Sequence, residues 1–263
     1  MDEVITLEIF DSIATLTLNR PKALNALNRE MAEGLNRVFR EIERNRSVRC
    51  LIITGAGDHF MAGGDIRYFQ QCLALPERER EAEVNSVIGI VNDAAAVLRR
   101  LPQPAIASIR GNVAGFGMSL VAACDLAIAA DNARFTQAYT QIATTPDGGN
   151  TFFLPRAVGL KRAAELSLLN RSLDAETALA WGLINKVVAN DALETETAGM
   201  ARRIRQGSVQ AMAGVKSLLN ASLQNPLEQQ LQLEQASFLR CALAADFREG
   251  LDAFLEKRRP EFL

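Results

Sequence analysis

Short apolar runs alternate with helix-length stretches along this chain, and this alternation limits the possible fold classes. Residues 4–9 and 13–18 alternate apolar with polar side chains around Asp11-Ser12, which predicts two short strands joined by a turn. Further apolar runs of strand length follow at 50–53, 105–109 and 126–129. Between them, apolar residues recur at helical spacing over 27–42 and 77–100. This alternation of strands and helices predicts an α/β fold.

The last third of the chain is predicted to be almost wholly helical. Helical spacing dominates there, and Asp174 and Gly182 predict the N-cap and the end of one helix. Only the short stretch 184–188 has the composition of a strand. We predict a core from residues 1–190, and no Pro/Ser-rich linker separates this core from the rest of the chain. Residues 191–263 would then form a helical subdomain of the same structural unit.

Composition places the chain among ordinary globular proteins and narrows its partners. Of its 263 residues, 48% are hydrophobic and 23% charged, and the net charge is -2. Arg residues are interleaved with Glu, as in 77–81, so no basic face for nucleic acid is predicted. No apolar stretch reaches the roughly 20 residues of a membrane helix. The acidic start Met1-Asp2-Glu3 does not resemble a signal peptide. We therefore expect a cytoplasmic protein without nucleic-acid or membrane partners.

Metal, disulfide and triad chemistry find little support in the sequence. The 4 cysteines lack a CxxC pair or a histidine at ligand spacing, and they are scattered at positions 50, 72, 124 and 241. His59 is the one histidine, so any Ser-His-Asp or Cys-His site would have to use it. We expect no metal and no separate cofactor.

Two glycine-rich turns are the strongest candidates for a functional site. Residues 60–66 and 111–117 each follow an apolar run and lead into a helix. Such turns can aim free backbone N–H groups at one ligand oxygen and so form an oxyanion hole. The alternative is that the glycines only permit tight turns. A dinucleotide site is excluded because Leu120 stands where the third glycine belongs. Ser119 lacks the final glycine of a nucleophile elbow.

The pattern F-x-A-G-x-D-I at 60–66 and the segment 111–125 resemble the two oxyanion segments of the crotonase (enoyl-CoA hydratase/isomerase) superfamily. The likeness continues in the stretches 19–26, 155–159 and 254–258. It implies a crotonase-like spiral of repeated strand-strand-helix units with a C-terminal helical trimerisation region. It also implies assembly as a homotrimer or a dimer of trimers.

The resemblance further implies roles for particular residues toward an acyl-CoA thioester. The N–H groups of Gly64 and Phe116 would hold the thioester oxygen. The CoA path and its surroundings would be formed by Lys22, Ala23, Leu24, Ala62, Gly63, Asp65, Ile66 and Gly115. Tyr139 is interpreted as a wall of the acyl pocket in preference to a hydrogen-bond donor. Phe254 and Lys257 would approach CoA from the same or a neighbouring subunit, and CoA would enter as part of the substrate.

Two departures from the family pattern favour isomerisation. Ser119 and Tyr139 stand where hydratases of this family carry two glutamates, so ordinary hydration lacks its acid and base. Asp147, in the stretch 145–149, stands where dienoyl-CoA isomerases and the phenylacetate-pathway ring isomerase carry a catalytic aspartate. We therefore predict an enoyl-, dienoyl- or ring-type acyl-CoA isomerase in which Asp147 moves the proton. The alternatives are a hydratase with a non-standard acid/base set and a non-catalytic acyl-CoA-binding protein.

The state of Asp147 is left open by the sequence. Pro-Asp-Gly is also an ordinary turn sequence, and Asp readily caps helices. A helix N-terminus would lower the pKa of Asp147, whereas desolvation by Tyr139, Phe116 and Phe152 would raise it.

The remaining polar residues of the motifs are predicted to have no catalytic part. Ser119 is interpreted as a spectator, and Asp65 and Asp125 as structural residues that hold loop N–H groups or pair with Arg. The acyl pocket is expected to be lined by the stretch 70–92 together with Tyr139 and Phe152. Because that stretch follows no motif, neither the acyl group nor the pathway can be read from the sequence.

Overall fold

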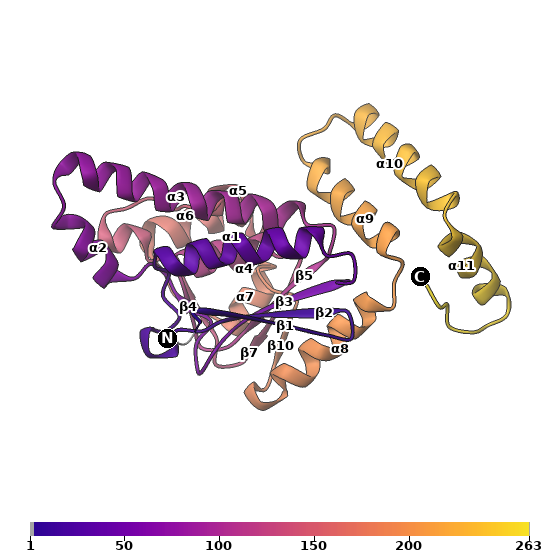
Figure 1. The fold of residues 1–263 in the computed structure, drawn as a ribbon, viewed down its shortest axis with the longest axis horizontal. Coiled ribbons are helices and arrows are strands. Elements are labelled where there is room, and N and C mark those ends of the chain that lie inside the picture. The colour runs from indigo at the N-terminus through magenta and orange to yellow at the C-terminus, as the bar shows by residue number, and fades with distance from the viewer. Residues whose placement is uncertain (1–2, 263) are drawn as a thin grey trace.

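The central feature of the fold is a 6-stranded sheet in the order β1-β2-β3-β5-β7-β10 (Figure 1). The computed structural model describes residues 3–262, so Met1 and Asp2 of the acidic start lie outside the described residues. β1 and β2 pair antiparallel, and the other neighbours pair parallel. The bounds, which confirm the predicted strands, are Ile5–Phe10 (β1), Ile13–Leu18 (β2), Cys50–Gly55 (β3), Ala105–Ile109 (β5), Leu126–Ala130 (β7) and Lys186–Val188 (β10).

A second, smaller sheet has the order β4-β6-β8-β9. Its strands are Met61–Ala62 (β4), Asn112–Ala114 (β6), Arg134–Thr136 (β8) and Leu173–Asp174 (β9). Each of β3, β5 and β7 is followed by one strand of this small sheet and then by helical structure. The chain therefore repeats strand, strand and helix, which confirms the spiral that the resemblance implied.

Helices cover the sheets and continue beyond them. The predicted helix ends are confirmed, because Asp174 accepts a hydrogen bond from Thr177 N–H at 2.8 Å and Gly182 ends that helix with φ +80°. In the spiral the helices are Arg29–Arg44 (α1), Ile66–Leu73 (α2), Glu77–Arg100 (α3), Phe116–Ala123 (α4), Asn150–Val158 (α5), Leu160–Leu169 (α6) and Ala175–Trp181 (α7). Later helices are Leu193–Arg205 (α8), Val209–Ser222 (α9), Leu227–Ala242 (α10) and Ala245–Leu255 (α11). Short 3₁₀ turns lie at Pro21–Ala23, Tyr139–Ile142 and Asn190–Ala192.

Alternating side chains bury both faces of the large sheet. On β3, Leu51 and Ile53 enter the main hydrophobic core together with residues of α1, α3 and α4. Cys50 and Ile52 point the other way, into a smaller cluster completed by Leu193 of α8. Figure 1 shows α8 on the side of the sheet opposite to α1 and α3. Because both faces are covered, the central parallel strands β3, β5 and β7 are largely apolar.

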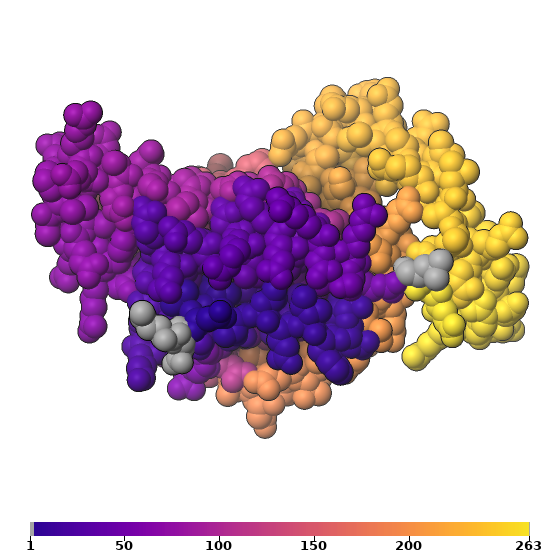
Figure 2. Space-filling view, in the orientation of Figure 1, coloured from indigo at the N-terminus to yellow at the C-terminus, as the bar shows by residue number. Residues whose placement is uncertain are grey.

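The helices α9, α10 and α11 extend away from the core as an arm (Figure 1), which forms a lobe beside the main body (Figure 2). This arm exposes many large apolar side chains, among them Leu227, Leu231, Phe238, Leu239, Leu243, Phe254 and Leu255. Helix α8, which begins after the predicted boundary at residue 190, packs against the sheet and not in the arm. The division of the chain at residue 190 stays a prediction. Within residues 3–262, no helix is long and apolar enough to cross a membrane.

A buried ion pair joins the arm to the core. The ammonium group of Lys216 on α9 is 6% exposed and lies 2.7 Å from Asp125 Oδ2. Lys216 also donates to the carbonyl oxygen of Gln103 at 3.0 Å. The carboxylate of Asp125 accepts from Ala105 N–H at 2.8 Å, and Arg99 lies 3.9 Å from its other oxygen. These contacts confirm the structural role predicted for Asp125.

Replacing Lys216 by methionine should destabilise the fold by about 3 kcal/mol, because the largely buried carboxylate of Asp125 loses its nearest cation. Urea denaturation monitored by circular dichroism measures this free energy of unfolding. The double variant Lys216→Met/Asp125→Asn removes both charges and should recover part of the loss. A single variant as stable as the wild-type protein would contradict the role given to the pair.

Candidate active site

Three parallel strands of the small sheet bring three loops to one edge. Ala62 of β4 pairs with Ala114 of β6, and Ala114 pairs in turn with Thr136 of β8. Because the carboxyl ends of parallel strands lie at the same edge, the segments that follow them are neighbours. Those segments are 63–66, 115–117 and 137–139. The two predicted oxyanion segments therefore meet, although they lie far apart in the sequence.

Two glycines allow these segments to touch. Gly63 and Gly115 have φ values of +90° and +49°, and a Cβ atom on Gly115 would lie only 3.1 Å from Gly63 Cα. A larger residue at either position would be strained and would push the loops apart. Next to these glycines, the N–H groups of Gly64 and Phe116 have no acceptor among residues 3–262. Phe116 opens α4, so its N–H belongs to the first turn and has no intrahelical partner.

An earlier segment of the chain holds the first loop. Leu27 N–H donates to the carbonyl oxygen of Gly63 at 2.7 Å, and Ala62 N–H donates to the carbonyl oxygen of Leu24 at 3.0 Å. Three residues predicted for the CoA path lie in or directly after the 3₁₀ turn Pro21–Ala23 that precedes Leu27, namely Lys22, Ala23 and Leu24. They do not line the main cavity themselves. The contact of Leu24 with Ala62 is what connects them to it.

Asp65 has the structural role predicted for it. Its side chain caps α2 by accepting from Arg67 N–H at 3.0 Å, and it pairs with Arg20 at 2.8 Å. Partial burial by itself would raise the pKa of Asp65, but these hydrogen bonds lower it overall. Asp65 thereby fixes the start of α2, the helix that carries Ile66 and Phe69 into the cavity.

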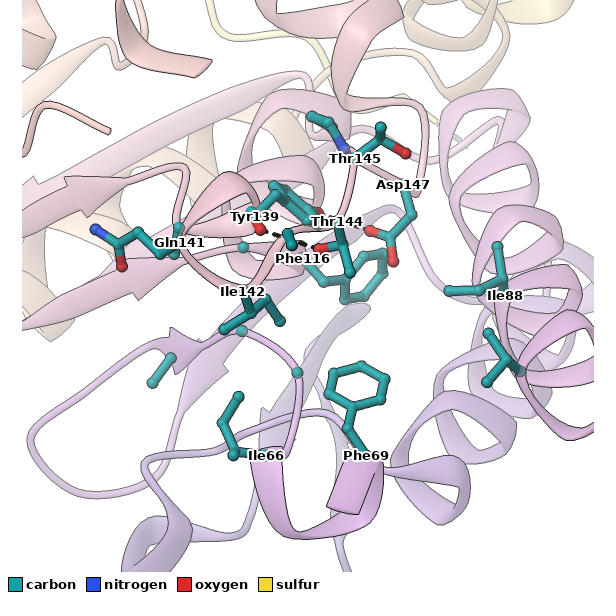
Figure 3. A pocket seen from close by; sticks show the side chains of 18 of the residues that line it. Ile66, Phe69, Ile88, Phe116, Tyr139, Gln141, Ile142, Thr144, Thr145 and Asp147 are labelled. Atoms are coloured by element: carbon teal, nitrogen blue, oxygen red, sulfur yellow. Dashed lines mark hydrogen bonds between the residues drawn. The ribbon is translucent and has the colours of Figure 1, made fainter. Parts of the chain in front are cut away.

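A cavity of about 870 Å³ lies between the oxyanion loops, α2, α3 and the segment 138–147 (Figure 3). The predicted residues Gly64, Phe116, Tyr139 and Asp147 all line it, as do Ala62, Gly63, Ile66 and Gly115. From the predicted stretch 70–92, the lining residues are Val84, Ile88 and Asn92. The apolar part of the lining also includes Phe69 and Ile142. The volume lies in the range of pockets that hold drug-sized ligands, so the cavity has room for an acyl group.

The expectation that Phe152 lines this cavity was wrong. Phe152 is 37% exposed, and the guanidinium of Arg156 lies 3.6 Å from its ring centre. The neighbouring Phe153 packs against the core instead. The phase of α5 turns one of these two adjacent rings inward and the other outward.

Hydrogen bonds hold the carboxylate of Asp147 at the wall of the cavity. The hydroxyl of Tyr139 donates to Asp147 Oδ1 at 2.6 Å, as Figure 3 shows. Ser119 Oγ donates to the main-chain carbonyl oxygen of Asp147 at 2.9 Å and lies 3.0 Å from the Tyr139 hydroxyl. The second carboxylate oxygen, Oδ2, has no partner among the described residues. It is the free oxygen of a carboxylate that borders the cavity.

These contacts correct two interpretations of the sequence. Tyr139 does form a wall of the cavity, but it is also a hydrogen-bond donor, the role that was set aside. Ser119 is not a spectator, because it contacts both Tyr139 and the backbone of Asp147. Ser119 lies one helical turn after Phe116 on α4, so both residues face the same side of that helix.

The peptide group between Asp147 and Gly148 is clamped from both sides. Its carbonyl oxygen accepts from Ser119 Oγ at 2.9 Å and from Asn150 N–H at 3.0 Å. Its N–H, which belongs to Gly148, donates to Asn92 Oδ1 on α3 at 3.0 Å. Asn92 ends the stretch 70–92 that was predicted to line the pocket, but no individual role was predicted for it. The available signal was its position four residues after Ile88, which places a polar side chain on the face that α3 turns to the cavity.

Burial decides the question left open about the pKa of Asp147. Desolvation raises this pKa above its ordinary value, and the hydrogen bond from Tyr139 opposes the rise without cancelling it. Burial also raises the pKa of Tyr139, helped by the nearby Asp147, so its hydroxyl keeps its proton. When Asp147 is ionised, the hydroxyl groups of Tyr139 and Ser119 supply two hydrogens for the three oxygen–oxygen contacts of this network. When Asp147 is protonated, its carboxyl group supplies a third hydrogen. The network therefore accommodates both protonation states.

The remaining predicted residues lie apart from this cavity within the chain. Phe254 is on α11 and Lys257 follows it, and Figure 1 shows α11 at the far end of the arm from α2 and α3. His59 Nδ1 accepts from Asn112 N–H at 3.1 Å and lines no part of the cavity. Across residues 3–262, no cluster of His, Cys, Asp and Glu is arranged to hold a metal ion.

Comparison with known proteins agrees with this geometry over the whole chain. The family model described as Enoyl-CoA hydratase/isomerase matches residues 8–263. The 1,2-epoxyphenylacetyl-CoA isomerase of Escherichia coli strain K12 is 36% identical over 262 residues, 100% of this chain and 99% of that protein. The Crotonyl-CoA hydratase of Syntrophomonas wolfei is 35% identical over 262 residues, 99% of this chain and 98% of that protein.

Solved structures give the same result. The crystal structure of an enoyl-CoA hydratase from Polaromonas sp. JS666 superposes with a TM-score of 0.92 at 31% identity, covering 98% of this chain and 99% of that one. Both isomerases and hydratases are therefore among its relatives. By fold, motifs and full-length similarity, the chain belongs to the enoyl-CoA hydratase/isomerase family of the crotonase superfamily.

Proposed function

We propose that this protein is an acyl-CoA isomerase, of the enoyl, dienoyl or ring type, in which Asp147 moves the proton. The observation that carries the proposal is the largely buried Asp147 carboxylate, with Oδ1 held by Tyr139 and Oδ2 free beside the cavity. It lines the same cavity as Gly64 and Phe116, whose N–H groups have no other acceptor among the described residues. A base and an oxyanion hole in one desolvated site are what enolate chemistry requires.

In the proposed reaction, the thioester oxygen accepts hydrogen bonds from Gly64 and Phe116. Asp147 Oδ2 takes a proton from one carbon, and the electron pair of the broken C–H bond forms an enolate whose charge rests on the bound oxygen. The same carboxyl group returns the proton to a different carbon of the conjugated system. The double bond moves, and the carboxylate is regenerated. The reaction transfers no electron to or from the substrate and consumes no water. We therefore propose that it needs no separate cofactor and that CoA enters only as part of the substrate.

Hydration is the alternative, because hydratases are among the relatives of this chain. The contacts of Asp147 disfavour it. Adding water requires one group to deprotonate the water and another to supply the second proton. Ser119 and Tyr139, at the two positions in question, are both engaged with Asp147. A non-catalytic acyl-CoA-binding protein would need no desolvated carboxylate, because burying one without use lowers stability.

We also propose a homotrimer or a dimer of trimers. The exposed apolar side chains of α10 and α11 would be covered in such an assembly, and Phe254 and Lys257 could then reach the CoA of a neighbouring subunit. The cytoplasmic location stays a prediction.

Replacing Asp147 by asparagine should lower kcat for double-bond migration about 10³-fold, because the amide cannot take up the proton. The reaction is followed with enoyl-CoA and dienoyl-CoA esters in deuterated water, where migration and deuterium incorporation are measured together by mass spectrometry. The matched variant Asp131→Asn changes an exposed aspartate outside the cavity and should retain full activity. Exchange at the wild-type rate in Asp147→Asn would overturn the assignment of the base. A product heavier by one water in the wild-type protein would favour the hydratase.

Tyr139→Phe should move the acid limb of the pH profile of kcat/KM to higher pH. The reaction needs ionised Asp147, so kcat/KM falls as the pH drops through the pKa of that carboxyl group. Burial raises this pKa, and the Tyr139 hydroxyl partly offsets the rise by donating to the carboxylate. Removing the hydroxyl therefore raises the pKa further, and the loss of activity is largest at low pH.

The chain's other tyrosine provides the matched control for this profile. Tyr68 donates to Glu83 rather than to Asp147, so Tyr68→Phe should leave the acid limb where it is. An unshifted limb in Tyr139→Phe, or a shift to lower pH, would show that the hydroxyl does not stabilise the ionised carboxylate.

Size-exclusion chromatography with light scattering should give a mass of about three or six times 28.7 kDa. Substituting aspartate for Leu243 and Phe254, which are 80% and 81% exposed in the single chain, should shift the protein toward monomers. A monomeric wild-type protein at micromolar concentration would contradict the proposed assembly.

A further inference from the structure

Asn92 has a hydrogen-bonding group that the proposed proton transfer does not use. Its side chain lines the cavity, and its Oδ1 accepts from Gly148 N–H at 3.0 Å. A backbone N–H can only donate, so the atom facing it is the amide oxygen and not the amide nitrogen. The NH2 group is left with two hydrogens and no acceptor among residues 3–262.

The position of this amide relates it to the reacting end of the cavity. Val84, Ile88 and Asn92 follow one another at intervals of four residues on α3, and all three line the cavity. They form a single stripe on one helix face, with two aliphatic members and one polar member. Asn92 is the member that contacts the residue after Asp147, so its amide lies at the Asp147–Gly148 peptide group, and the aliphatic side chains lie farther along α3.

We propose that Asn92 determines substrate specificity by donating a hydrogen bond from Nδ2 to an oxygen atom of the acyl group. The substrates are then acyl-CoA thioesters that carry an ether, epoxide, hydroxyl or carbonyl oxygen close to the reacting carbons. This inference rests on the proposed function, because it takes Asp147 as the place where the proton moves. An acyl group made only of hydrocarbon would cover the amide without replacing its hydrogen bonds to water, and binding would be weaker.

Two unreactive thioesters of matched shape test the proposal by binding alone. (Oxan-2-yl)acetyl-CoA carries a ring oxygen where cyclohexylacetyl-CoA carries a methylene group, and neither contains a double bond to be moved. Isothermal titration calorimetry gives the ratio of their Kd values. We expect the wild-type protein to favour the ether, and Asn92→Leu to reduce this preference about fivefold. The loss should come from weaker binding of the ether.

A second variant separates the donor from the support of the loop. Asn92→Asp keeps an oxygen that can accept from Gly148 N–H but lacks the NH2 group, so at mildly alkaline pH it should lose the preference to a similar extent. Ile88→Val, one turn earlier on the same face of α3, is the control. It should change the affinity for both thioesters alike and leave their ratio unchanged.

The outcomes distinguish this inference from the function on which it rests. If both thioesters bind the wild-type protein and their Kd ratio is the same in Asn92→Leu and Asn92→Asp, the role of Asn92 is overturned while the isomerase proposal stands. If neither thioester binds the wild-type protein, the ligand class given to Asn92 is wrong and the inference is overturned, whereas the proposed function is decided separately by deuterium exchange through Asp147. A preference for the ether that both variants lose and Ile88→Val keeps would support it.

Discussion

The parallel pairing of β4, β6 and β8 is the constraint on which the candidate site depends. These strands are only two or three residues long, yet their parallel register places the start of the three following loops at one edge of the sheet. The close contact of Gly63 with Gly115 brings together the two loops that carry the N–H groups of Gly64 and Phe116, which have no acceptor among residues 3–262. The proposed oxyanion hole therefore depends on backbone geometry and not on any particular side chain.

The carboxylate of Asp147 depends on a different kind of support. Its burial disfavours the ionised form, which the Tyr139 hydroxyl partly stabilises by donating to the carboxylate. In all, three side chains from α3, α4 and the segment after β8 hold the carboxylate or its peptide group. These side chains are Asn92, Ser119 and Tyr139. A group with a raised pKa that is fixed in this way can take up a proton and release it again with little rearrangement. Ser119 and Tyr139 are the residues that the family resemblance placed at the positions of the usual glutamates, and in the structure both contact Asp147.

Much of the fold could be predicted because its signals are local. The helix predicted over 77–100 is α3, and the strand predicted over 105–109 is β5, since periodicity and proline breaks act within a few residues. The loop residues Gly64 and Phe116 could be placed because their motifs are contiguous. Phe152 was misplaced because two adjacent rings look alike in sequence, and only the phase of α5 decides which one is buried.

The α/β class and the family could be read from the sequence, which also predicted the segments 60–66 and 111–117 as the oxyanion hole and Asp147 as the carboxylate that moves the proton. The direction in which the pKa of Asp147 shifts, and the contacts of Tyr139, Ser119 and Asn92, became visible only in the tertiary structure. The reason is physical. A pKa depends on burial and on partners that arrive from distant segments, and a hydrogen bond such as that from Gly148 to Asn92 joins elements whose approach no local pattern encodes.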